Sequence, residues 1–222
     1  MKQVSTESMG TRPLLPLIMS LSSPIMLSLL VQSLYNIIDS VYISHYDGNG
    51  LTALSLAFPV QTLITAVASG TGAGTNIIIA KALGANDSEN ASSTAFNGFV
   101  LSLINWSFFV IIGILILKPY FSIFTANTEV ASLGLKYLNI ILLFSIAPFT
   151  ENVAVRILQA TGNTFMPMIF QSAAALLNLL LDPIFIWGFG VIPAMGISGA
   201  AIATVLSQFL SAALEIGRAS CR

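Results

Sequence analysis

The sequence predicts an all-α membrane protein with six transmembrane helices. Of its 222 residues, 55% are hydrophobic and only 8% are charged, whereas soluble domains carry about 25% charged residues. Six apolar stretches are long enough to cross a bilayer, which takes roughly 20 helical residues. Because so few charges cannot cover a water-facing surface, we expect a chain embedded in lipid.

The first three predicted spans cover residues 14–42, 51–79 and 95–117. The first is too long for the apolar core of a signal peptide, and no small-residue cleavage site follows it, so we expect it to remain as a span. The polar segments HYDGNG and KALGANDSEN separate these three spans. Both segments are rich in turn-forming residues, so we expect them to be loops.

The last three predicted spans cover residues 138–158, 167–187 and 194–214. They follow the segments FTANTEVASLGLK, QATGNT and GFGVIPAMG, which are typical of connections. Near the inner end of the span 138–158, we expect Glu151 and Arg156 to reach interfacial water rather than to pair with each other.

Positive charges in the flanks of the spans predict the orientation. If the N-terminus is inside, four of these residues are cytoplasmic and two are outside: Lys2, Arg12, Lys81 and Arg156 against Lys118 and Lys136. We therefore expect a multi-pass protein of the cell membrane with residues 1–13 as a cytoplasmic N-terminus.

Two aspartates, Asp39 and Asp182, lie inside the apolar spans. A carboxylate in hydrocarbon costs a few kcal/mol, roughly, and is tolerated where it faces a protein interior or a wet cavity. No Lys or Arg is near either residue in the sequence, which favours a cation or proton site over an ion pair. Both lie roughly 6–9 Å below the outer boundary, so they can share a site if their helices adjoin.

Asn178 precedes Asp182 by one helical turn, and Pro183 follows it. The proline removes an N–H and so frees the carbonyl of Leu179. A carboxylate, an amide and a free carbonyl are hard oxygen ligands that suit a small cation such as Na⁺. The alternative is a polar pair that only hydrogen-bonds between helices.

Four polar residues of the first span form one stripe: Gln32, Tyr35, Asn36 and Asp39. Such a stripe lines a cavity or packs inside a bundle. Cavity lining is favoured because packed interfaces more often use small residues.

Small residues mark two other spans. The segment GISGAAIAT opens the last span and favours close helix packing, with Thr204 adding a hydroxyl group. The run GTGAGT at 70–75 lacks the Lys-Ser/Thr ending of a phosphate-binding loop and lies in an apolar span, so we expect it to pack rather than to bind nucleotide.

Five segments in order resemble the N-terminal half of a multidrug and toxic compound extrusion (MATE) transporter, of the prokaryotic DinF-like or multidrug-pump type. The similarity covers roughly residues 12–214, and the segments are LVQSLYNIIDSVYIS, LTALSLAFPVQTLITAVASGTGAGTNIIIAKALGAND, RILQATGNTFMPM, NLLLDPIFIWGFG and GISGAAIAT.

The resemblance implies twelve membrane helices in two lobes around a cavity, with residues 14–214 as the six-helix N-lobe. It implies export of a cationic or amphipathic organic compound in exchange for Na⁺ or H⁺, with no other cofactor. The implied partners are a small organic substrate, the lipid bilayer and the C-terminal lobe.

The resemblance also implies residue roles. The cation site matches Asp39, Asn178, Asp182 and Thr204, with Ala200 one turn before Thr204. Gln32 and Tyr35 match cavity-lining positions.

The segment EIGRASCR at 215–222 departs from the family pattern. It follows a small-residue helix with charges and a cysteine, and it reads like a translated sequencing adapter. We therefore expect a non-native tail on a truncated half of a longer transporter.

Two alternatives remain: a lipid-linked oligosaccharide flippase of the same superfamily, and a six-helix module that must dimerise. A flippase is expected to need a more cationic cavity for a pyrophosphate. An enzyme is disfavoured because the single His45 and the single Cys221 provide no metal or nucleophile constellation. The net charge of −1 gives no electrostatic basis for binding nucleic acid.

Overall fold

The computed structural model describes residues 13–220, and within this range the protein is helical except for short connections and one isolated bridge between Phe189 and Ile192. Five helices are long and apolar enough to cross a membrane, and a bent pair of helices makes a sixth candidate span. The predicted all-α membrane fold is therefore confirmed. Lys2, Arg12 and Cys221 lie outside the described residues.

The helices extend beyond most of the predicted spans. They are α2 (Leu14–Tyr46), α3 (Gly48–Gly84), α4 (Ser88–Phe124), α5 (Thr128–Leu143), α6 (Ile146–Ala160), α7 (Phe165–Trp187) and α8 (Ile197–Ser220).

Two polar segments expected to be loops are largely helical, because their aspartates cap helices. Only Asp47 separates α2 from α3, and its Oδ1 accepts a hydrogen bond from the backbone N–H of Asn49 at 2.9 Å. Asp87 likewise accepts from the N–H of Asn90 at 3.0 Å, at the start of α4. An N-cap carboxylate satisfies a free backbone N–H, so polar residues here start helices rather than extend loops.

The fourth predicted span is a bent pair of helices rather than one straight helix. α5 and α6 meet at an angle of 46°. Pro148 lacks the N–H that would have bonded to the carbonyl of Phe144, which interrupts the helical ladder at this point. The carbonyl of Phe144 accepts from the N–H of Ala147 instead, at 3.2 Å. The indole N–H of Trp106 donates to the carbonyl of Leu143, the last residue of α5, at 3.0 Å.

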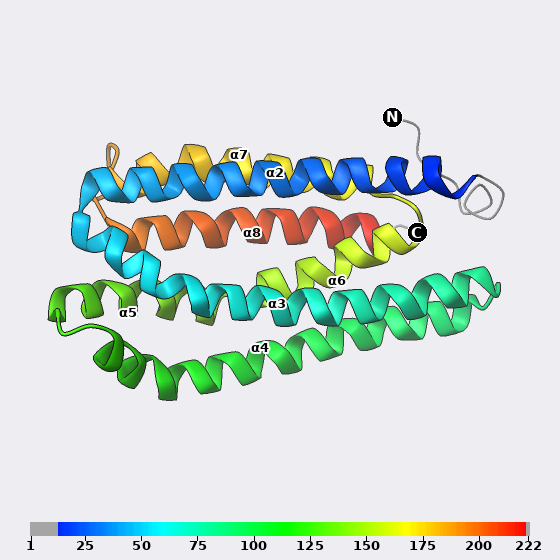
Figure 1. The fold of residues 1–222 in the computed structure, drawn as a ribbon, viewed down its shortest axis with the longest axis horizontal. Coiled ribbons are helices and arrows are strands. Elements are labelled where there is room, and N and C mark those ends of the chain that lie inside the picture. Colours follow the sequence, from blue (N-terminus) through cyan, green and yellow to red (C-terminus); the bar gives the residue numbers. More distant parts are fainter. Residues whose placement is uncertain (1–12, 221–222) are drawn as a thin grey trace.

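The helices form a flat bundle in which α8 is central (Figure 1). α2 packs along α7 on one side of it, and α3, α4, α5 and α6 pack together on the other. α8 contacts α7 and α6, and so connects the two groups. Large apolar side chains are exposed on the outside, as on α4 at Ile111, Ile114 and Leu115, which suits contact with lipid.

Small residues allow α8 to lie close to α7. Ala200, Ala201 and Ala203 are fully buried. A Cβ on Gly199 would collide with the backbone carbonyl of Phe185 on α7. This agrees with the close packing expected from the segment GISGAAIAT.

One glycine of the GTGAGT run has the same function between α3 and α6. A Cβ on Gly72 would lie 2.9 Å from Cγ of Arg156 and 3.1 Å from the backbone oxygen of Asn152. A Cβ on Gly74 would meet nothing within 4 Å. Of the three glycines in the run, Gly72 alone has the expected packing role, since a Cβ on Gly70 would also meet nothing within 4 Å.

Replacing Gly72 by Val should destabilise the protein more than replacing Gly74 by Val. Both changes alter helix propensity equally, but only Gly72→Val forces α3 away from α6, and overpacking of this kind costs about 1–3 kcal/mol. Thermal unfolding of the detergent-solubilised intact protein measures the difference. Equal melting temperatures for the two variants would contradict the close contact.

Candidate functional site: a polar cavity beside two buried aspartates

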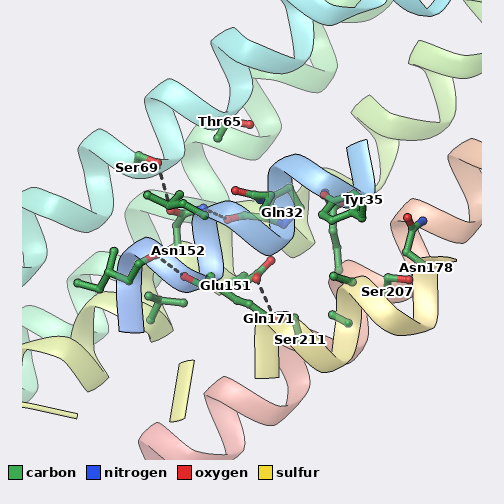
Figure 2. A pocket seen from close by; sticks show the side chains of 18 of the residues that line it. Gln32, Tyr35, Thr65, Ser69, Glu151, Asn152, Gln171, Asn178, Ser207 and Ser211 are labelled. Carbon is green, nitrogen blue, oxygen red and sulfur yellow. Dashed lines mark hydrogen bonds between the residues drawn. The ribbon is translucent and has the colours of Figure 1, made fainter. Parts of the chain in front are cut away.

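A polar cavity of about 240 Å³ lies among α2, α3, α6, α7 and α8 (Figure 2). Carboxylate, amide, hydroxyl and phenol groups line it, including those of Gln32, Tyr35, Glu151, Asn152, Gln171, Asn178, Thr204, Ser207 and Ser211. Since the outside of the bundle is apolar, these groups give the lobe a polar interior. Such lining groups can hydrogen-bond a ligand and fix its orientation.

The polar stripe of α2 is divided between two surfaces. Gln32 and Tyr35 line the cavity. Asn36 does not, and instead it lines a groove with Ser40 and Ser44. The stripe covers about a quarter of the helix circumference, which is wider than the side of α2 that faces the cavity. Within this lobe, Asn36 therefore lies apart from Gln32 and Tyr35.

The two aspartates are buried side by side behind the cavity. Asp39 is 6% exposed and Asp182 is 0% exposed, and neither lines the cavity. Their helices pack together, and the rings of Tyr42 and Trp187, one turn or so beyond the aspartates, are in edge contact at 5.6 Å. The carboxylates are close enough for their charges to interact. The structure therefore brings together the two residues that the sequence analysis expected to share a depth.

Several buried oxygen atoms at this place have no hydrogen-bond donor. The side-chain N–H of Asn178 donates to Oδ1 of Asp182 at 3.3 Å. Oδ2 of Asp182, Oδ1 of Asn178 and Oδ1 of Asp39 are buried without a partner. Such unsatisfied acceptors call for a proton, a bound cation or water. The donor set is made of hard oxygens, so it fits a small cation such as Na⁺ as well as a proton.

The two predicted residues of α8 have different surroundings. Thr204 lines the cavity, as Asn178 does, so its hydroxyl lies on the side from which an ion would enter. Ala200 is fully buried in the apolar core, and its methyl group offers no ligand. Only Thr204 can therefore add a side-chain oxygen.

Sequence analysis missed Glu151, which lines the cavity instead of reaching interfacial water. Its Oε1 accepts a hydrogen bond from Oγ of Ser211 at 2.8 Å (Figure 2). Arg156 also lines the cavity, and its Nη1 donates to Oε1 of Gln159 at 3.0 Å. The criterion that identified the aspartates, a carboxylate inside an apolar span, applies to Glu151 as well and would have found it.

A family model comparison identifies the chain. Residues 24–184 match the model described as MatE. The chain belongs to the MatE family. The match covers most of the chain, including α3, α4, most of α2 and both aspartates, and it confirms the resemblance found in the sequence.

Relatives of this MatE chain are named for transport, export or multidrug resistance. The FAD transporter of Shewanella oneidensis is 29% identical over 91% of this chain and 45% of its own length. The probable multidrug resistance protein NorM of Thermotoga maritima is 28% identical over 89% of this chain and 42% of its own length. The multidrug export protein MepA of Staphylococcus aureus is 28% identical over 90% of this chain and 44% of its own length. The chain thus spans less than half the length of these relatives.

Solved MATE transporters have the same helix arrangement as this lobe. An outward-facing multidrug resistance MATE transporter is 34% identical, with a TM-score of 0.84 over 90% of this chain and 43% of that chain. An inward-facing MATE transporter is also 34% identical, with a TM-score of 0.80 over 90% of this chain and 44% of that chain. The chain has the fold of the N-terminal lobe of a MATE multidrug efflux transporter.

Replacing Asp182 by Asn should raise the melting temperature of the intact protein at alkaline pH without added sodium. The change removes an unpaired buried charge and supplies amide donors for the unsatisfied oxygens. The rise should be about 2–4 °C for each kcal/mol recovered.

The matched control is Asp87→Asn, which removes one negative charge at an exposed helix start while Asn remains a good N-cap. Its melting temperature should stay close to that of the wild type. A lower melting temperature for Asp182→Asn than for this control would show that the protein itself compensates the Asp182 charge.

Proposed function

We propose that this chain is the N-terminal lobe of an antiporter that exports cationic or amphipathic organic compounds in exchange for Na⁺ or H⁺. The observation that supports this proposal most is the pair of buried aspartates, which has unsatisfied oxygens and lies beside a polar cavity. The names of the relatives support transport rather than enzymatic catalysis.

The proposed mechanism starts from repulsion between the two carboxylates. When both Asp39 and Asp182 are ionised, their charges oppose close packing of α2 and α7, and binding of H⁺ or Na⁺ relieves this repulsion. Asn178 couples the cation site to the cavity, because its side-chain amide donates a hydrogen bond to Asp182 and also lines the cavity. Closer packing of α2, α7 and α8 would then shrink the cavity and expel the organic compound.

Coupling requires that the cation and the organic compound favour different conformations of the lobe. With the N-terminus in the cytoplasm, both aspartates lie in the outer half of the membrane, so external cations reach them first. That polarity suits export driven by inward ion flow.

The alternatives are less well supported. A flippase for a lipid-linked oligosaccharide should have several basic groups for its pyrophosphate. Of the described residues that line the cavity, Arg156 is the only basic one. A six-helix module that dimerises would have to form the second half of the cavity from another copy, whereas the relatives of this chain are about twice its length.

In the intact transporter, Asp39→Asn and Asp182→Asn should each reduce ion-driven efflux of a cationic dye by about tenfold or more, which corresponds to roughly 1.4 kcal/mol of lost coupling. Efflux is measured from cells or vesicles with an imposed inward gradient of Na⁺ or H⁺. Asp87→Asn, at equal expression, should retain wild-type efflux. Full ion-driven efflux by either α2 or α7 variant would refute the proposed cation site.

The source DNA beyond codon 214 should encode six further apolar spans in place of EIGRASCR. Sequencing of the genomic locus is the measurement. A stop codon directly after Arg222 would contradict the two-lobe proposal and would leave a dimer of six-helix lobes as the remaining form of a transporter.

A further inference from the structure

Glu151 differs from the other buried acidic residues in that it faces the cavity. Among the described residues, it is the one acidic side chain that lines the cavity, whereas Asp39 and Asp182 lie behind the lining. A molecule in the cavity therefore meets the carboxylate of Glu151 directly.

The carboxylate of Glu151 is held in place by two neutral side chains. Oγ of Ser211 on α8 donates to its Oε1 at 2.8 Å, and the side chain of Gln171 on α7 also hydrogen-bonds to it. Both partners are neutral donors, which stabilise a carboxylate but do not neutralise it. The cavity's arginine, Arg156, donates to Gln159 instead. Glu215 on α8 is also buried and within electrostatic range of Glu151. A cationic ligand in the cavity would therefore supply the counter-charge that Glu151 needs when it is ionised.

The site at Glu151 is separated from the aspartates along the bundle. Ser211, which binds Glu151, lies about two helical turns beyond Thr204 on α8, a rise of about 10 Å. Tyr35 is within electrostatic range of Glu151 and of both aspartates, so it stands between the two sites. Figure 2 shows Tyr35 between Asn178 and the Glu151–Ser211 pair.

We infer that Glu151 binds the positively charged group of the exported organic compound, while Asp39 and Asp182 hold the coupling ion. This inference rests on the proposed function. The surroundings fit the division of roles. Amides, hydroxyls and open volume around Glu151 suit a large, weakly hydrated organic cation. The tightly enclosed oxygens of Asp39, Asn178 and Asp182 suit a small ion.

Equilibrium binding of tetraphenylphosphonium to the purified intact transporter tests this inference without relying on ion-driven transport. Glu151→Gln should weaken binding about tenfold or more, because it removes the charge but keeps an oxygen that accepts from Ser211. Glu151→Asp should restore part of the affinity. Glu89→Gln, an exposed residue at the start of α4, should bind like the wild type.

Tetraphenylborate, an anion of nearly the same size and shape, separates a charge effect from a structural one. Its binding to Glu151→Gln should be unchanged or stronger than its binding to the wild type. If Glu151 merely joined α6 to α8, the variant would weaken both ions alike, and that result would overturn the inference.

The remaining outcomes separate this inference from the proposed function. Asp39→Asn should still bind tetraphenylphosphonium while it loses ion-driven efflux. If efflux depends on Asp39 but Glu151→Gln binds the cation normally, the inference fails and the proposed antiport stands. A wild type that prefers tetraphenylborate to tetraphenylphosphonium would overturn both the inference and export of organic cations.

Discussion

The buried carboxylates of Asp39 and Asp182 have no basic partner among the described residues, and the rest of the lobe accommodates this unfavourable charge. A carboxylate at membrane depth is costly, and the cost is larger when a second one is close. The chain places both where two helices, α2 and α7, pack together and where a polar cavity begins. A proton or cation at this place would relieve this cost, and the proposed mechanism depends on that link between ion binding and helix packing.

The packing around this pair depends on small residues. Gly199 lets α8 approach the backbone of α7, and Gly72 lets α3 approach the backbone of α6. Together these contacts place α8 between the two groups of helices, where Thr204 and Ser211 line different levels of the same cavity. The polar interior and the apolar exterior thus arise from one arrangement of helices.

The sequence was sufficient to predict the fold class, and it singled out the two aspartates that the structure buries on adjoining helices. Burial of a carboxylate in an apolar span has a large energetic cost, so Asp39 and Asp182 could be recognised one residue at a time. Helix ends could not be predicted well, because Asp47 and Asp87 serve as caps and their polarity suggested loops instead. The bend between α5 and α6 depends on Pro148 and on a contact from Trp106 on another helix.

Which surface a side chain faces was harder to predict than which helix carries it. Asn36 shares a helical stripe with Gln32 but faces a separate groove, because only neighbouring helices decide where the cavity ends. Glu151 was assigned to the interface because Arg156 and the end of its span were near in sequence. Its hydrogen bond to Ser211 joins residues that are 60 positions apart, and no local pattern reveals it.

Competition between the coupling ion and an organic cation tests most directly whether the aspartates couple to the cavity. Tetraphenylphosphonium affinity of the purified intact transporter is measured at increasing Na⁺ and, separately, at decreasing pH. The account predicts that at least one of the two ions weakens binding in the wild type, and that Asp182→Asn removes this effect, because coupling between two ligands is reciprocal. Affinity that is independent of both ions in the wild type would contradict it.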